Sequence, residues 1–273
     1  MSEQPNTNKP QPTLDHIVIL VSASDLEQLP DRLKDSFVVS PGGTHAGGQT
    51  FNKLILFEDG VYIELIAFTE GISPEERAKH RWGRQRENTI VDWAYTLPHE
   101  SDFGAVQQRV RDANAGLTYR DPVPGGRTRP DGVVLKWAIG APQDANGHET
   151  EPGILPFWCL DRTPRSNRVP YQEDKRQTQH PSGARGVSRL RLNVPEEQLS
   201  SLQSVYDAIH NVKNTAKGEN EWLFNTPDSS AKARHTLGVA SESGPKIKLA
   251  FQGSVGSPSF LEILPGIVVK FEA

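Results

Sequence analysis

The spacing of hydrophobic and polar residues predicts many short strands and few helices. Residues 14–21, LDHIVILV, are apolar on both faces, which predicts a buried strand. Leu26, Leu29 and Leu33 then recur at helical spacing, and Ser24 is a candidate cap for that helix. Three strands are expected after it, the last two joined by a tight Glu-Asp-Gly turn, at residues 37–39, 52–57 and 61–68. The predicted order is therefore β-α-β-β-β.

The same order of elements recurs further along the chain. A second set is predicted at residues 89–97, 102–115, 118–121, 133–139 and 154–160. A looser third set consists of a strand, a helix and four strands, at residues 187–194, 195–212, 221–225, 235–239, 247–251 and 259–263. One open sheet of this kind cannot bury its concave face alone. The repetition therefore predicts an α+β fold in which βαβββ modules, two clear and a third looser, form curled mixed sheets around a cavity.

Changes in composition predict the boundaries between these units. Residues 1–13 are polar and rich in proline, which predicts a disordered tail. Residues 14–161 hold the two clear modules, which we expect to form one domain around a shared cavity. Residues 162–186 combine prolines and charges without periodicity, and are expected to be a linker. The third module, residues 187–273, is expected to pack on the first two.

Composition and charge narrow the classes of function. No apolar run approaches the roughly 20 residues of a membrane span, and the first residues lack a secretory signal, which predicts a cytoplasmic protein without membrane attachment. A net charge of -4 argues against nucleic-acid binding. The single cysteine, Cys159, excludes a cysteine-rich zinc site. No phosphate-loop or dinucleotide pattern is present, so no nucleotide cofactor is expected. Metal chemistry, acid–base chemistry or simple binding remain, in a monomer or homodimer.

His16 and Glu64 are the most informative polar residues, because each lies in the middle of an apolar strand. A buried carboxylate without a partner is unfavourable, so Glu64 needs a cation, a metal or a proton. An imidazole and a carboxylate on neighbouring strands can bind a divalent ion. The same pair can instead form a base and its orienting partner, because burial would raise the pKa of the carboxyl toward neutrality. A buried His–Glu hydrogen bond with only a structural role is an equal alternative.

A glycine-rich segment, residues 41–50, separates the first helix from the next long strand. His45 lies in it, and its glycines allow the chain either to wrap a ligand or simply to turn. Asn52 and Lys53 open the following strand and can point polar groups into the same cavity. We therefore expect His45, Asn52 and Lys53 to contact a small-molecule ligand.

The second module contributes further candidates for ligand binding. Arg127 and Arg129 lie just before a Pro-Asp-Gly turn, and an arginine that enters a cavity can bind a carboxylate through two hydrogen bonds. Pairing with Asp131 offers a structural explanation for Arg129. Trp137 supplies aromatic surface, which serves more often as core than as a ligand platform. Arg127, Arg129 and Trp137 complete the expected substrate-binding set.

The chain resembles the glyoxalase-like domain family of the vicinal-oxygen-chelate superfamily in four segments, LDHIVILV, GGTHAGGQTFNKLILFEDGVYIELIAF, GGRTRPDGVVLKW and ILPFW. The most specific part is the Gly-Gly-x-His loop followed by T-x-N and Y-I-E-L, over residues 42–65. The resemblance covers residues 14–161 well and residues 187–273 weakly. It implies paired βαβββ modules around a cavity. It also implies metal ligands from the first and last strand of each module, on which a metal would bind vicinal oxygens of a substrate.

By this resemblance, His16 and Glu64 occupy the two ligand positions of the first module. The second module departs from the family pattern. Trp93 stands where a second histidine is expected, and Leu160 stands where a second carboxylate is expected, with Asp161 on the opposite face. The resemblance thus implies a divalent-metal site with only two of its ligands, completed by water, substrate or the loop histidine. Catalytic zinc sites usually keep three protein ligands.

Three functions are consistent with these residues. The first is an enzyme of lyase, isomerase or oxygenase type acting on a small oxygenated organic molecule. In it, His16 and Glu64 hold a divalent ion or transfer protons, and His45 and Arg127 touch the substrate. The second is a metal-free binding or resistance protein that sequesters a ligand without turnover. The third is a structural role, in which His16 and Glu64 brace the core. We rank the three in this order, and the incomplete second module argues against glyoxalase I and extradiol dioxygenase activity.

Overall fold

The computed structural model describes residues 12–129, 131–212, 220–228 and 234–272. The predicted tail lies outside the described residues except at its end, where residue 13 already begins the first strand. The first module contains β1 (Thr13–Leu20), α1 (Ala23–Leu33), β2 (Ser40–Thr44), β3 (Thr50–Leu56) and β4 (Tyr62–Phe68). The second contains β5 (Thr89–Thr96), α3 (Phe103–Asp112), β7 (Val123–Thr128), β8 (Val134–Gly140) and β10 (Phe157–Asp161).

These eight strands form one sheet in the order β2-β3-β4-β1-β5-β10-β8-β7. In each module the last strand returns beside the first and runs parallel to it, as β4 does along β1 and β10 along β5. β1 and β5 pair antiparallel, so the two modules meet in the middle of the sheet. The expected α+β fold of two βαβββ modules is therefore confirmed.

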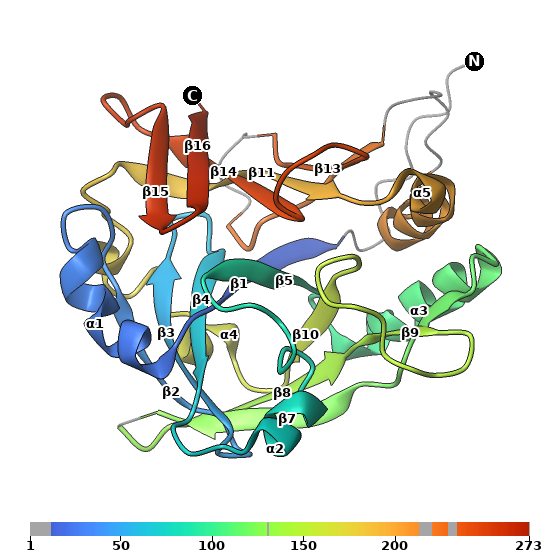
Figure 1. The fold of residues 1–273 in the computed structure, drawn as a ribbon, viewed down its shortest axis with the longest axis horizontal. Helices are drawn as coiled ribbons and strands as arrows, with labels where there is room; N and C mark the ends of the chain where they lie inside the picture. The colour runs from blue at the N-terminus through green and yellow to red at the C-terminus, as the bar shows by residue number, and fades with distance from the viewer. Residues whose placement is uncertain (1–11, 130, 213–219, 229–233, 273) are drawn as a thin grey trace.

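The eight-stranded sheet curls until its two edges nearly meet (Figure 1). His45, just after β2, forms an antiparallel bridge with Arg127 of β7. The amide of Ala46 also donates to the carbonyl of Gly126 at 2.9 Å. These contacts bring residues about 80 positions apart together and enclose a space on the concave side of the sheet.

The third unit forms a second sheet with a related but shorter topology. Its elements are β11 (Ala184–Asn193), α5 (Glu196–His210), β12 (Glu221–Leu223), β13 (Thr236–Ala240), β14 (Ile247–Gly253), β15 (Phe260–Leu264) and β16 (Ile267–Glu272). The strand order is β12-β13-β11-β14-β16-β15. β13 runs parallel to β11 and β16 runs parallel to β14, while β11 and β14 pair antiparallel. The unit thus contains two shortened modules. In the second of them, residues 254–259 connect β14 to β15 without a helix.

The second sheet covers the convex side of the first, with α1 beside one end of the interface and α3 and α5 beside the other (Figure 1). Ile17, Ile63 and Trp93 from the first sheet share one buried cluster with Leu190 and Phe251 from the second. Burial of this apolar surface stabilises the contact by roughly 25 cal/mol for each Å² removed from water. A separate apolar cluster lies on the concave side of the first sheet. The concave side is therefore the one left for a ligand.

Three local predictions differ from the structure. The expected strand at residues 37–39 is irregular, and β2 lies instead within the glycine-rich segment, paired with β3. Ser22, rather than Ser24, caps α1, because its Oγ accepts a hydrogen bond from the amide of Asp25 at 3.0 Å. The strand near residue 118 is β6 (Leu117–Tyr119), which pairs only with β9 (Pro142–Asp144) in a small separate sheet. In its place, β7 is the second strand of the second module.

The segment expected to be a linker, residues 162–186, is packed against the first sheet. It contains α4 (Arg165–Arg168) and a 3₁₀ turn, η2 (Lys175–Gln177). Arg168 and His180 are both buried. His180 accepts a hydrogen bond from the amide of Val38 at 3.1 Å and bonds the carbonyl of Leu56 at 2.9 Å. The segment lacks helical or strand periodicity because many of its buried residues are polar and bond to neighbouring elements.

The remaining short elements are η1 (Glu100–Asp102) and α2 (Pro74–Lys79). Ser73 caps α2, because its side chain accepts a hydrogen bond from the amide of Glu76. Within the part of the chain that the structure describes, no helix has the length and apolar character needed to cross a bilayer.

Candidate functional site

A cavity of about 300 Å³ lies on the concave side of the first sheet. Its size is at the lower end of the roughly 300–1,000 Å³ that is usual for small-molecule sites. Tyr62, Phe157 and Trp82 contribute apolar surface, and His16 and Glu64 contribute polar groups. His16 and Glu64, the two main candidates from the sequence, therefore line the same cavity.

Glu64 is ionised in this cavity although it is only 5% exposed. Its Oε1 accepts a hydrogen bond from Nδ2 of Asn52 at 2.5 Å and lies 3.5 Å from Nε2 of His45, while Oε2 lies 3.7 Å from Nε2 of His16. Burial opposes ionisation of the carboxyl, but His45, His16 and the Asn52 amide together lower its pKa to about 2. The expectation that burial would raise this pKa toward neutrality is therefore wrong, because the neighbouring donors outweigh burial.

His16 is held in one orientation by its neighbours. Its Nδ1 lies 2.6 Å from a carboxylate oxygen of Asp15, so Nε2 is left to face Glu64. The Tyr62 ring stacks on the imidazole with centroids 4.7 Å apart, and Phe157 contacts it edge-on at 5.3 Å. A histidine fixed in tautomer and ring orientation is suited to proton transfer.

Asp15 reaches His16 and Arg168, which line the cavity, because β1 contains a β-bulge. The register against β5 shifts between Leu14 and His16, so Asp15 is an extra residue in the strand. Leu14 consequently joins the core between the two sheets, although regular alternation places it on the same face as His16. Sequence reasoning missed Asp15. The available signal was a second carboxylate inside an apolar strand, which is the argument that identified Glu64.

Two arginines from α4 compensate the charge of Asp15. Arg168 donates to both oxygens of Asp15, at 3.0 and 2.9 Å, and Arg165 forms a further ion pair with it. Arg168 also donates twice to Asp161 at 2.8 Å and once to the Tyr62 hydroxyl at 2.7 Å. Although burial opposes it, these cations hold the pKa of the Asp15 carboxyl well below its usual range. The network pairs two carboxylates with two guanidiniums.

Four of the six expected substrate-binding residues line the cavity: His45, Asn52, Arg127 and Trp137. His45 is held by Thr50, whose Oγ1 lies 2.8 Å from its Nδ1, and Trp137 meets the His45 ring edge-on at 6.0 Å. The glycine-rich segment thus carries a histidine to the cavity through β2 and its bridge to β7.

The other two candidates do not line the cavity. Lys53 points away from it and lies 3.8 Å from Glu27. Arg129 lies in a neighbouring pocket, where it donates to Asp131 at 2.6 Å and to the carbonyl of Asn167 at 3.0 Å. Successive residues of a strand face opposite sides, which explains why Lys53 diverges from Asn52.

The second module presents no counterparts to His16 and Glu64. Trp93 and Leu160 point away from the cavity into the core between the sheets. The residues of β5 and β10 on the cavity side are instead Ala94, Phe157 and Cys159. Burial raises the pKa of the Cys159 thiol well above its ordinary value, so it is a neutral thiol rather than a thiolate.

The donor set of the cavity does not fit a catalytic divalent metal. His16 and Glu64 supply two donors, and Oε1 of Glu64 is already engaged by Asn52. His45, the loop histidine expected to complete such a site, also lies in the cavity, with its Nε2 3.5 Å from Oε1 of Glu64. Among the residues that the structure describes, no three histidine, cysteine or acidic side chains are arranged to hold an ion. Catalytic zinc sites use three protein ligands. The two residues expected as metal ligands share one cavity, but the described residues do not form a complete set of ligands around them.

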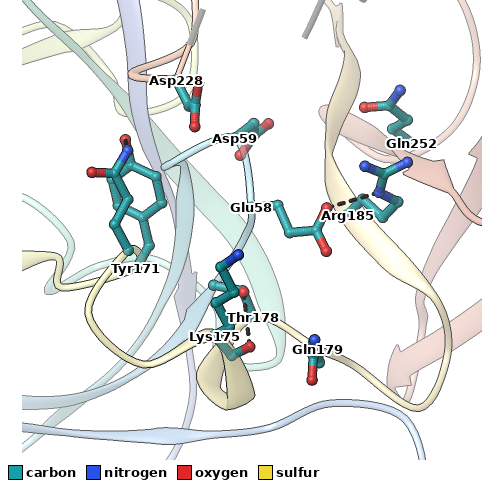
Figure 2. Close-up of a pocket in the computed structure, with 10 residues that line it drawn as sticks. Glu58, Asp59, Tyr171, Lys175, Thr178, Gln179, Arg185, Asp228 and Gln252 are labelled. Carbon is teal, nitrogen blue, oxygen red and sulfur yellow. Dashed lines mark hydrogen bonds and ion pairs between the residues drawn. The ribbon is translucent and has the colours of Figure 1, made fainter. Parts of the chain in front are cut away.

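A second pocket, of about 480 Å³, lies where the two sheets meet (Figure 2). Several of its polar groups are already engaged, and Glu58 pairs with Arg185 at 2.8 Å. Asp59 accepts hydrogen bonds from the amides of Val61 and Val187 at 2.9 Å each. Although larger, this pocket holds no histidine among its lining residues, so we assign the candidate site to the cavity of the first sheet.

Comparison with known proteins agrees with this geometry. The model of a family described as a glyoxalase-like domain matches residues 14–207. No curated protein matches the chain. Among solved structures, a hypothetical protein from Staphylococcus aureus is 15% identical, covers 96% of this chain and 99% of its own, and has a TM-score of 0.64. A methylmalonyl-CoA epimerase from Mycobacterium tuberculosis is 17% identical over 59% of this chain and 95% of its own, with a TM-score of 0.35. At 15% identity, the likeness to the Staphylococcus aureus protein shows the fold alone.

Proposed function

The chain belongs to the family of glyoxalase-like domains, within the vicinal-oxygen-chelate superfamily, and from that membership we propose that it is an enzyme of lyase or isomerase type. It would transfer a proton on a small oxygenated organic molecule bound in the cavity between the first two modules. The observation that carries the proposal is the arrangement of Asp15, His16 and Glu64, with one imidazole between two buried carboxylates.

Each of these residues has a role that its surroundings explain. His16 takes the proton at Nε2, because Asp15 holds Nδ1 and leaves Nε2 facing the cavity. The imidazolium that forms has a carboxylate on each side, at 2.6 and 3.7 Å, and both attract it more strongly than the neutral ring. Glu64 is the weaker base because its pKa is about 2, so it accepts a hydrogen bond from the substrate and balances charge.

Proton exchange in heavy water tests this proposal without a known substrate. The protein is incubated with a panel of aldehydes, ketones, hydroxy ketones and carboxylates, and loss of carbon-bound hydrogen is followed by proton NMR. We expect at least one compound to exchange. His16→Gln should slow that exchange by about 10²- to 10⁴-fold, the usual contribution of a general base, and Glu64→Gln by a smaller factor.

His148→Gln is the matched control, because the His148 side chain is 80% exposed in a loop and should leave exchange unchanged. Exchange that survives in His16→Gln overturns the proposal. Saturable binding without exchange by the wild type supports instead a metal-free binding protein, which the aromatic walls of the cavity also suit.

The involvement of a metal is decided by the same assay. Because the proposed transfer depends on side chains of the chain itself, exchange should persist after dialysis against EDTA. It should also remain unchanged on addition of Zn²⁺ or Mn²⁺. Loss of exchange on chelation and its recovery with one of these ions would assign His16 and Glu64 as metal ligands instead.

A further inference from the structure

Arg127 carries a buried positive charge that no carboxylate of the described residues contacts; the charge of Glu64 acts on it only at longer range, so its compensation is incomplete. It is 6% exposed and lines the cavity from β7. Its Nη1 donates to the carbonyl of Gly42 at 2.9 Å, and it forms no ion pair with any residue of the described ranges. Arg168, which lines the same cavity, shares two carboxylates. A buried guanidinium without a counter-charge is unfavourable unless a ligand supplies one.

The guanidinium of Arg127 is open to a ligand rather than sealed in the core. Besides the main cavity, Arg127 lines a pocket of about 250 Å³ that shares Leu54 and Arg168 with it. Arg129 also lines this smaller pocket, but its charge is taken up by Asp131. Arg127 therefore offers free N–H donors at the junction of two hollows, and a guanidinium has five donors in a planar fork.

We propose that the ligand of this cavity is a small carboxylate and that Arg127 binds its carboxylate group. This inference rests on the proposed function, since it names the substrate class of the same site. One incompletely compensated positive charge matches a singly charged carboxylate better than a doubly charged phosphate. The ionised Glu64 on the cavity wall repels a carboxylate, so the ligand is oriented with its carboxylate at Arg127.

The test compares matched ligands on the intact protein. A set of small carboxylates, their primary amides and the corresponding monophosphates is screened by saturation-transfer NMR, and hits are titrated by calorimetry. We expect carboxylates to bind about 10- to 100-fold more tightly than their amides, the range of a charge-assisted pair of hydrogen bonds. Arg127→Met should reduce that ratio to about one by removing the charge, and Arg127→Lys should restore part of it.

Arg129→Met is the matched control, because Arg129 lies on the same strand end with its charge already paired. It should leave the preference for carboxylates intact. The melting temperature of ligand-free Arg127→Met should equal or exceed that of the wild type, since an incompletely compensated buried charge is removed. A clear fall would show that Arg127 braces Gly42 instead, and would overturn the inference.

The two proposals fail separately. Equal binding of carboxylates and amides, or no carboxylate hit, overturns the role of Arg127, while proton exchange dependent on His16 would still stand. Conversely, a preference for carboxylates that depends on Arg127 supports this inference. If the same protein shows no proton exchange in heavy water, the proposed proton transfer is overturned.

Discussion

Asp15 contacts three cationic or ionisable side chains at once, His16, Arg165 and Arg168, while its own side chain is fully buried. Its ionised form is therefore needed both to orient the imidazole and to balance two guanidiniums. Removal of one partner from a buried ion pair leaves an uncompensated charge, which is more destabilising than the loss of a surface pair. The residue that sets the geometry of the site is thus also important for stability.

Asp15→Asn should lower the free energy of unfolding by about 3–5 kcal/mol, because Arg165 and Arg168 lose the charge between them. Urea unfolding measures this change. Asp161→Asn is the matched control and should cost less, since Asp161 is partly exposed and Arg168 still has its ion pair with Asp15. Equal losses in the two variants would show that Asp15 has no special place in the network.

At the scale of single residues, the sequence identifies the groups whose environment follows from strand alternation. His16 and Glu64 were found in this way, and they share the cavity. Asp15 was missed because regular alternation places its side chain on the face opposite His16, whereas a β-bulge changes that alternation. Arg168 was missed because it lies in a segment without periodicity, where only its tertiary partners reveal that it is buried.

β2 shows how closely one element is fitted to the site. It lies so close to β3 that a Cβ on Gly42 would come within 2.1 Å of the side-chain oxygen of Asn52. That oxygen accepts the amide of Gly43 at 3.0 Å, while the Asn52 amide nitrogen holds Glu64. The glycine therefore permits the contact through which β2 reaches the ionised carboxylate.

Gly42→Ala should destabilise the protein by about 1–3 kcal/mol and weaken ligand binding, since Asn52 must move away from Glu64. Gly47→Ala in the same segment should change stability by less than about 1 kcal/mol, because an added Cβ there meets no atom within 4 Å. Urea unfolding and calorimetric titration compare the two variants. Similar effects would show that the approach of β2 to Asn52 is not tight.

The predicted elements are reliable where apolar periodicity is strong, as in β1, β4, α1 and α5. β7 was not predicted, because its Gly125 and Gly126 have low strand propensity. The structure explains the glycine: a Cβ on Gly125 would lie 2.7 Å from Nε1 of Trp137 on β8. A strand whose glycines allow close packing, but which has low strand propensity, cannot be recognised from periodicity alone.

At the scale of the whole molecule, titratable groups lie in the contact between the two sheets. His210 of α5 accepts a hydrogen bond from the Tyr95 hydroxyl at 3.2 Å and bonds the carbonyl of Leu223 at 2.9 Å. Burial lowers the pKa of His210 to about 3 and that of His180 to about 4, and raises that of Asp59 to about 7. The stabilising contribution of the two histidines is lost as the pH falls below about 6.5, and that of Asp59 is lost as the pH rises toward 7. The free energy of unfolding is therefore expected to be largest at about pH 7.

The contribution of His210 can be isolated. Its pKa is depressed on folding, so its stabilising contribution is complete above about pH 6.5 and is lost as the pH falls toward 3. Between pH 7 and 4.5 the wild type should lose about 2 kcal/mol more than His210→Gln, measured by urea unfolding at each pH. His148→Gln should follow the wild type, and identical pH dependence in His210→Gln would place the acid sensitivity elsewhere.

The central strand pairs of the two sheets share an irregularity. The register of β1 with β5 shifts at two places, and so does that of β11 with β14. The two sheets therefore repeat one arrangement, in which an irregular antiparallel pair joins two parallel strand pairs. Only the first copy encloses His16 and Glu64, while the outer side of β11 carries Arg189 and Arg191, which pair with glutamates. One arrangement of strands thus has two uses in this chain: in the first sheet it surrounds the candidate site, and in the second it closes the core.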